Sequence, residues 1–150
     1  MKINKILYPM DFSKYSYEFI DYVHYMSKTH DAELIILHVI EYIPYDSYFD
    51  IIVDSQEDIL KQFFKKSEEK INEIIKSIPD ITVTSKIIHG EPFNELIEVT
   101  KNENIDIIVM ATHGHSSIIH SIIGSLTEKV VRKAPCPVMI LKPKDFISKM

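Results

Sequence analysis

The hydrophobic pattern of the chain rests on five short apolar runs, most of them rich in Ile and Val. They cover residues 6–8, 34–40, 83–88, 105–110 and 138–141. The second and fourth runs are continuous rather than alternating, which is typical of strands buried on both faces of a parallel sheet. The pattern therefore predicts five strands in a parallel arrangement.

The segments between these runs are amphipathic, with the spacing of helices. Phe19, Val23 and Met26 recur at three- and four-residue intervals, separated by polar residues. A longer apolar stripe, predicted to face the sheet, consists of Leu60, Phe63, Phe64, Ile71, Ile74, Ile75 and Ile78. Alternating strands and helices imply right-handed crossovers and a parallel sheet with helices on both faces. We expect one domain over residues 1–150, with ligands bound beyond the carboxyl ends of the strands.

Three helix starts carry local signals. Asp54 stands three residues before Glu57, and Ser125 stands three residues before Glu128. Both pairs have the spacing of a capping box. Pro92 follows a Gly-Glu turn and suits a first helical turn. We therefore expect Ser125 to cap the last helix.

The composition is that of a globular protein. The 150 residues are 45% hydrophobic and 26% charged, and the net charge is -5. The negative balance gives no electrostatic help to nucleic-acid binding, and no apolar run approaches the length of a membrane span. A lone cysteine excludes an intrachain disulfide framework and fits a reducing compartment. We expect a cytoplasmic protein without nucleic-acid or membrane partners.

The segment MATHGHSSIIHSIIGS, residues 110–125, holds two of the three glycines in the chain. It joins the fourth predicted strand to the last predicted helix. A helix start fed by a glycine offers unpaired backbone N–H groups and the positive end of the helix dipole, which together attract phosphate. Gly114 and Gly124 are candidates for this role, and Ser125 could add its hydroxyl. The alternative is that Gly114 is an ordinary turn residue and Ser125 only a cap.

Histidines and one aromatic segment add candidate chemistry. His113, His115 and His120 cluster in the same loop, but no carboxylate or cysteine lies nearby in sequence, so we expect no metal site there. His38 stands near a strand end beside apolar residues and is interpreted as a packing or turn residue. The segment 41–53 is rich in Tyr and Phe. It is either a lid or partner surface, or it packs on the edge of the domain.

Four stretches of the chain together resemble the universal stress protein family. They cover almost the whole length and read ILYPMDFSKYS, ELIILHVIE, HGEPFNELIEVTKNENIDIIVMATHG and GSLTEKVVRKAPCPVMILKP. Nucleotide-binding members of that family carry the motif G-x2-G-x9-G-[ST] after the fourth strand. Gly114, Gly124 and Ser125 match its spacing, whereas Ala111 replaces its first glycine. A phosphate-facing backbone tolerates this alanine if its φ is negative and is strained if its φ is positive.

The resemblance implies a fold and an assembly. Family members have an open, parallel five-stranded sheet in the order 3-2-1-4-5 with helices on both faces, an α/β fold like that of the adenine-nucleotide α-hydrolases. They commonly dimerise by pairing their last strands, which here run from Cys136 to Lys142. An unpaired apolar edge strand favours such pairing. The alternative is that the tail 143–150 covers this strand.

The resemblance also implies where an adenine nucleotide would lie. The base and ribose would lie at the ends of the first two strands, flanked by Pro9, Met10 and Asp11, with backbone contacts from Val39. Asp11 is the best candidate for a polar contact; its other role would be to cap the first helix, as Ser13 could. Mg²⁺ or Mn²⁺ could be held through the phosphates. The residues that would line the ribose and the phosphates are Met110, Ala111, Gly114, His115, Gly124, Ser125 and Leu126.

Two functions follow from the resemblance. The first is an ATP-binding, dimeric regulatory or signalling protein of the stress response, with at most slow ATP hydrolysis because no residue reads as a catalytic base. The second is a nucleotide-free dimeric interaction module of the same family. A dedicated phosphoryl-transfer enzyme is disfavoured, because the segment 110–125 contains no Lys or Arg. His115 stands where related sequences often have a basic residue, which predicts phosphate affinity that depends on pH.

Overall fold

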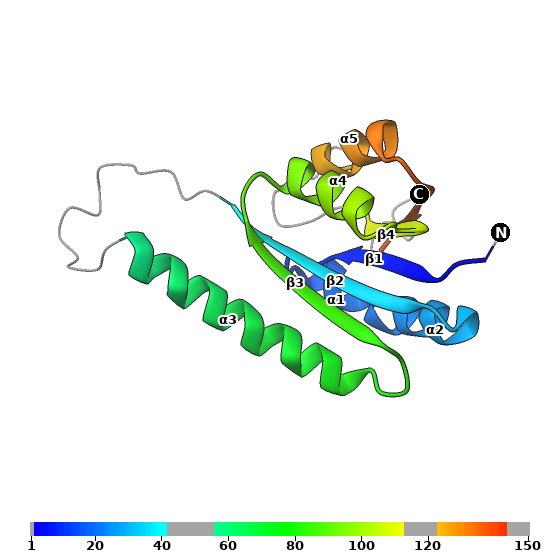
Figure 1. The fold of residues 1–150 in the computed structure, drawn as a ribbon, viewed down its shortest axis with the longest axis horizontal. Coiled ribbons are helices and arrows are strands. Elements are labelled where there is room, and N and C mark those ends of the chain that lie inside the picture. Colours follow the sequence, from blue (N-terminus) through cyan, green and yellow to red (C-terminus); the bar gives the residue numbers. More distant parts are fainter. Residues whose placement is uncertain (1, 42–55, 113–122, 144–150) are drawn as a thin grey trace.

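Five parallel strands form one sheet in the computed structural model of the chain, which describes residues 2–41, 56–112 and 123–143 (Figure 1). The strand order is β3-β2-β1-β4-β5, and every neighbouring pair is parallel. The predicted fold class and the order 3-2-1-4-5 are thus confirmed. The strands are β1 Lys5–Pro9, β2 Glu33–Ile40, β3 Val83–His89, β4 Ile107–Ala111 and β5 Val138–Leu141.

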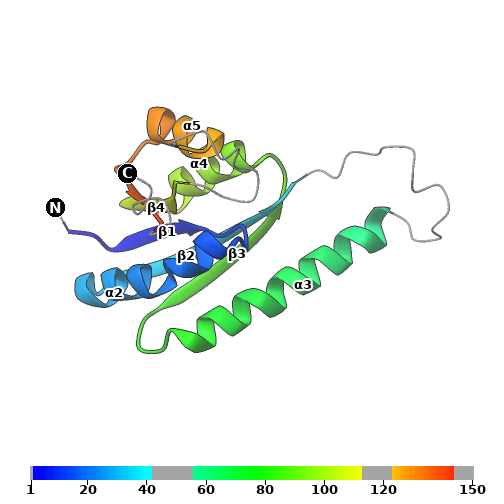
Figure 2. The same ribbon diagram turned by 180° about the vertical axis from the view of Figure 1, so that it is seen from behind.

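Helices cover both faces of the sheet (Figures 1 and 2). The buried side chains of α2 and α3 join one core cluster, and those of α4 and α5 join the other. The crossovers from β1 to β2 and from β2 to β3 proceed in one direction along the sheet, whereas those to β4 and β5 proceed in the other. Because connections of this kind are right-handed, the two sets of helices lie on opposite faces. The helices are α1 Lys14–Glu18, α2 Ile20–His30, α3 Gln56–Ser77, α4 Pro92–Asn102 and α5 Ser125–Lys133.

β1 shows how an uninterrupted apolar run fills both core clusters. Ile6 and Tyr8 are completely buried in the cluster with α2 and α3, whereas Leu7, between them, is completely buried in the other cluster. Successive side chains of a strand point to opposite faces. A strand covered on both sides therefore needs apolar residues at every position, which is the pattern seen in the sequence.

Local sequence signals hold at two helix starts, those of α1 and α4. Ser13 caps α1, and its Oγ accepts the backbone N–H of Ser16 at 3.2 Å. Pro92 lies in the first turn of α4 as predicted, and the Glu91 side chain caps that helix by accepting a backbone N–H at 2.9 Å. The predicted cap Asp54 lies outside the described residues.

The predicted cap of α5 is wrong by one position. Gly124 is the N-cap residue, Ser125 is the first helical residue, and no side chain in the described part of the chain caps this end. Glu128 then falls one residue too far along the helix for a capping box. Its carboxylate instead accepts a hydrogen bond from Arg132 at 3.0 Å, in an exposed i,i+4 pair.

The apolar stripe of α3 is buried over only part of its length. Ile71, Ile74 and the following Ile78 are buried in the core. Phe63, which was predicted to face the sheet, is 43% exposed. The first turns of α3 extend beyond the strands that its later turns cover (Figure 1), so helical spacing alone overstates the buried part of the stripe.

A carboxylate ties the amino ends of β1 and β4 together. The Asp106 Oδ2 atom, just before β4, accepts the backbone N–H groups of Asn4 at 2.7 Å and Lys5 at 2.9 Å. Both bonds lower the pKa of Asp106, and the bond from Asn4 has the larger effect. Their geometry favours the ionised carboxylate, so this contact between the two strands depends on charge.

Candidate functional site

The strand order changes direction between β1 and β4. β1 leads to β2 on one side and pairs with β4 on the other, so the connections leaving the two strands diverge. In open α/β sheets this divergence leaves a crevice beyond the carboxyl ends, which is where ligands bind. The residues that leave the sheet at this point are Pro9, Met10 and Asp11 from β1, and Ala111 and Thr112 from β4.

The start of α5 is fixed against the end of β4 by two hydrogen bonds. The Gly124 N–H donates to the Thr112 carbonyl at 2.7 Å, and the Thr127 hydroxyl donates to the Ala111 carbonyl at 3.1 Å. Thr112 is itself buried, and its N–H donates to the Leu141 carbonyl at 3.0 Å. The structure thus brings Ala111 and Gly124 together, although twelve residues separate them in sequence.

The first turn of α5 presents main-chain N–H groups that have no acceptor within the helix. Gly124 has φ -66° and ψ 152° and offers no side-chain acceptor. The first intrahelical bond is donated by the Glu128 N–H to the Gly124 carbonyl, at 2.9 Å. The N–H groups of Ser125, Leu126 and Thr127 precede it at the positive end of the helix dipole. Together they can bind an anion.

Ala111 meets the condition under which a motif glycine can be replaced. It is the last residue of β4, is half-buried, and is not among the non-glycine residues with positive φ. Its methyl group therefore imposes no backbone strain. The substitution leaves the Ala111 carbonyl available to hold α5 in place through Thr127.

Asp11 lies half-buried where the chain leaves β1, and the cap of α1 is Ser13 instead. The Asp11 Oδ1 atom accepts the Ser13 N–H at 3.0 Å. Beneath it, the Tyr8 hydroxyl donates to the Ser16 carbonyl at 2.6 Å. Burial first, and the negative charge of Asp11 second, raise the pKa of Tyr8. Asp11 is therefore the acidic group at this edge of β1, with one carboxylate oxygen engaged by the turn.

The remaining predicted residues at the base end lie on the same edge of the sheet. Pro9 pairs with Leu37 of β2, and the Met10 N–H extends this pairing by donating to the Leu37 carbonyl at 2.8 Å. Val39 lies two residues further along β2 and is half-buried. Met10 and Met110 are buried beneath this edge. Gly114 and His115 lie outside the described residues, and so do His113 and His120.

Two neighbours of Asp11, His38 and Phe12, were not predicted to belong to the site. The His38 Nδ1 atom lies 2.7 Å from the Met10 carbonyl oxygen. Phe12 has φ 60°, and its ring centroid lies 4.4 Å from that of His38. The Lys70 ammonium, from α3, lies 4.8 Å from the centroid of the Phe12 ring. His38 is a packing residue, as predicted, but its contact with Met10 spans 28 residues of sequence and has no local signal.

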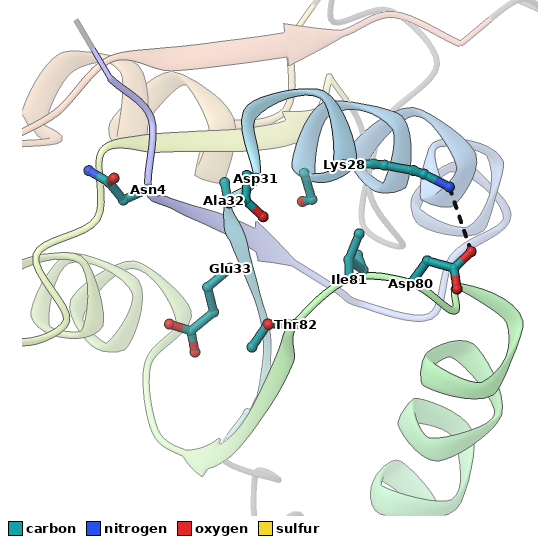
Figure 3. A pocket seen from close by; sticks show the side chains of 9 residues that line it. Asn4, Lys28, Asp31, Ala32, Glu33, Asp80, Ile81 and Thr82 are labelled. Carbon is teal, nitrogen blue, oxygen red and sulfur yellow. Dashed lines mark ion pairs between the residues drawn. The ribbon is translucent and has the colours of Figure 1, made fainter.

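A separate pocket of about 530 Å³ opens at the opposite, amino-terminal edge of the sheet (Figure 3). Lys28 pairs with Asp80 across it at 3.6 Å. Three carboxylates against one ammonium group make this pocket unsuited to phosphate. Among the residues that the structure describes, no three metal-ligating side chains come together and no helix is long and apolar enough to span a membrane. The pocket is lined by Asn4, Ser27, Lys28, Asp31, Ala32, Glu33, Asp80, Ile81 and Thr82.

The similarity to known proteins extends over almost the whole chain. The model of the universal stress protein family matches residues 2–142. Universal stress protein MJ0577 of Methanocaldococcus jannaschii is 28% identical over 155 aligned residues, covering 94% of this chain and 96% of that protein. The solved structure of MJ0577 superposes with a TM-score of 0.83 at 29% identity, over 96% of this chain and 99% of the other.

Two more distant structures share the fold and contain adenine nucleotides. One is a universal stress protein in complex with cAMP, with a TM-score of 0.65 at 18% identity, over 94% of this chain and 98% of the other. The second is the universal stress protein from Archaeoglobus fulgidus in complex with dAMP. It has a TM-score of 0.64 at 16% identity, over 93% of this chain and 98% of the other.

Proposed function

The chain belongs to the universal stress protein family, and from this premise we propose that it binds ATP at the carboxyl edge of β1 and β4. It would act as a dimeric, cytoplasmic regulatory protein of the stress response, with at most weak ATP hydrolysis. Ligand binding stabilises whichever state holds the ligand better. ATP would thus favour one dimeric or partner-bound state over another.

One observation carries the proposal: the start of α5 is held against the end of β4, and among the described residues no side chain caps its first-turn N–H groups. A triphosphate would accept from the N–H groups of Ser125 and Leu126, with the Ser125 hydroxyl as a further donor. The Gly114 and His115 segment would complete this site. No lysine or arginine occurs in residues 110–125, so the grip on phosphate would come from main-chain dipoles.

The base end of the site supports an adenosine ligand. Asp11 would accept from ribose or base, Pro9 and Met10 would flank the base, and the main chain at Val39 would contact its edge. The nucleotides in the two distant relatives, cAMP and dAMP, share adenine and a phosphate with ATP. Asp11 is the one acidic side chain among the proposed ligand residues, so Mg²⁺ or Mn²⁺ would be held mainly through the phosphates.

β5 supports a dimer formed through residues 136–142. It is the edge strand of the sheet, and its Met139 side chain is 37% exposed. The Pro137 carbonyl accepts from Ile108 of β4, and the Leu141 carbonyl accepts from Thr112, which follows β4. Alternation along a strand turns the N–H and C=O of Val138 and Ile140 away from β4, toward a second copy of β5.

Calorimetry with ATP and Mg²⁺ tests the nucleotide site, after mass spectrometry of any nucleotide released on denaturation. Gly124→Val should abolish binding while the chain stays folded, because Gly124 has a φ that valine readily adopts. Val131→Thr, on the exposed face of the same helix, is the matched control and should bind as wild type does. No released nucleotide and no heat of binding would favour the nucleotide-free interaction module, and turnover well above background would favour an enzyme.

A further inference from the structure

We propose that His38 is a positioning residue for the nucleotide site, which fixes the Asp11 carboxylate by holding the main chain of Met10 against β2. This inference rests on the proposed adenine-nucleotide site. It assigns to His38 no contact with the ligand itself. The effect passes through the Met10–Asp11–Phe12 turn, which carries the acidic group Asp11 at the end of β1.

Both backbone polar groups of Met10 are hydrogen-bonded to consecutive residues of β2. The Met10 N–H donates to the Leu37 carbonyl at 2.8 Å, and the Met10 carbonyl lies 2.7 Å from His38 Nδ1. A carbonyl oxygen only accepts, so Nδ1 carries the proton and donates it. The chain is therefore pinned one residue before Asp11, after the regular pairing of β1 has ended.

Phe12, the residue after Asp11, is held in an energetically unfavourable backbone conformation. Phe12 has φ 60°, in the left-handed region that bulky residues rarely adopt. Such a conformation persists only where the surroundings over-determine it. Here the Phe12 ring lies against the His38 imidazole, with centroids 4.4 Å apart, and the Lys70 ammonium lies over the same ring at 4.8 Å. His38 thus contacts the turn on both sides of Asp11.

Asp11 lies between the two residues that His38 contacts, Met10 and Phe12. Its Oδ1 atom accepts the Ser13 N–H at 3.0 Å, so a shift of the turn would move the carboxylate and lengthen this bond together. The Ser13 amide therefore reports on the position of Asp11 without any ligand. The pKa of His38 is lowered, mainly by burial, which favours the neutral ring. In that ring Nδ1–H is the donor to Met10.

Two isosteric variants test the role. In His38→Asn the side-chain amide nitrogen takes about the place of Nδ1, whereas in His38→Gln it takes about the place of Nε2. By calorimetry on the full chain with ATP and Mg²⁺, we expect His38→Asn to bind within about threefold of wild type. His38→Gln should bind about tenfold more weakly, as for one lost hydrogen bond. Equal affinity in all three proteins, or equal weakening in both variants, would overturn the proposal.

Amide hydrogen exchange at Ser13, followed by NMR without nucleotide, separates this inference from the proposed function. Exchange should be about tenfold faster in His38→Gln and close to wild type in His38→Asn. If wild type binds no ATP, the proposed function fails, and faster exchange confined to His38→Gln still supports the positioning role. Unchanged Ser13 exchange in both variants would overturn the positioning role whatever ATP does.

Discussion

The main-chain amide of Ser125 can be deleted without disturbing the helix that carries it. Ser125 is the first residue of α5, a position where proline is favoured because the N–H there has no acceptor in the helix. The residue before a proline must be extended, and Gly124 already has φ -66° and ψ 152°. Ser125→Pro should therefore fold, with a free energy of unfolding within about 0.5 kcal/mol of wild type.

The loss of affinity follows from the kind of bond removed. A hydrogen bond to a charged group contributes about 1.5–3 kcal/mol, which corresponds to about 10- to 150-fold in the dissociation constant. The proline also removes the serine hydroxyl. Ser125→Ala removes that hydroxyl alone and keeps the amide, so it should weaken ATP binding by no more than about tenfold. The ratio between the two variants isolates the contribution of the amide.

Calorimetry with ATP and Mg²⁺ measures both dissociation constants, and urea unfolding measures both stabilities. The expected order of affinity is wild type, then Ser125→Ala, then Ser125→Pro, at similar midpoints of unfolding. If Ser125→Pro is as stable as wild type and binds ATP as tightly as Ser125→Ala does, the Ser125 amide does not touch phosphate. The proposed grip by the start of α5 would then be refuted.

Four further predictions concern stability and assembly. Ser27 is completely buried, and its hydroxyl has no hydrogen-bond partner among the described residues, so Ser27→Ala should raise the free energy of unfolding in urea by about 1 kcal/mol. Ser16→Ala, which loses a 2.9 Å bond to the Ser13 carbonyl, should lower it by about the same amount. Ile140→Pro removes an N–H that points away from β4, so light scattering should find a monomer that remains folded; a stable dimer would argue against pairing through β5. The pKa of Asp106 is lowered in the fold, so its contribution to stability is present above the ordinary aspartate pKa of about 3.9 and is lost as the pH falls through the lower, folded value. Asp106→Asn should therefore destabilise the chain at neutral pH and much less in strong acid, and an equal loss at both would contradict the charge-dependent contact.

The strands were predictable because burial on both faces leaves a signal within each run. Ile6, Leu7 and Tyr8 are apolar at consecutive positions, and each of the three side chains is completely buried. The start of α4 was likewise predictable, from Pro92 and the glutamate before it. Local signals of this kind need no knowledge of which segments meet, so the fold class could be read from the sequence.

The errors arise where spacing does not fix a position along a helix or its extent over the sheet. Ser125 and Glu128 have capping-box spacing, but the helix begins one residue earlier than that motif requires. Phe63 continues the apolar stripe of α3 beyond the part that contacts the sheet. Neither outcome is encoded by the order of polar and apolar residues alone, because each depends on where neighbouring elements end.

The candidate site was predictable only where its residues adjoin strand ends. Asp11 and Ala111 could be placed at the carboxyl edge from the strand pattern, and Gly124 from the loop that follows. The hydrogen bond from His38 to Met10 joins a residue of β2 to the residue that follows β1, and the left-handed conformation of Phe12 occurs at a residue type that rarely adopts it. Such contacts follow from the assembled sheet, not from the local sequence.

The central place of β1 has a consequence for how the chain is made. Ile6 pairs with Ile107, so one side of β1 has no partner in this sheet until about a hundred more residues have been synthesised. Until then a strand with three buried apolar residues exposes an open edge, which is the kind of surface that chaperones and aggregation compete for. The nascent chain therefore completes the crevice beyond β1 and β4 and covers the open edge of β1 in a single late event.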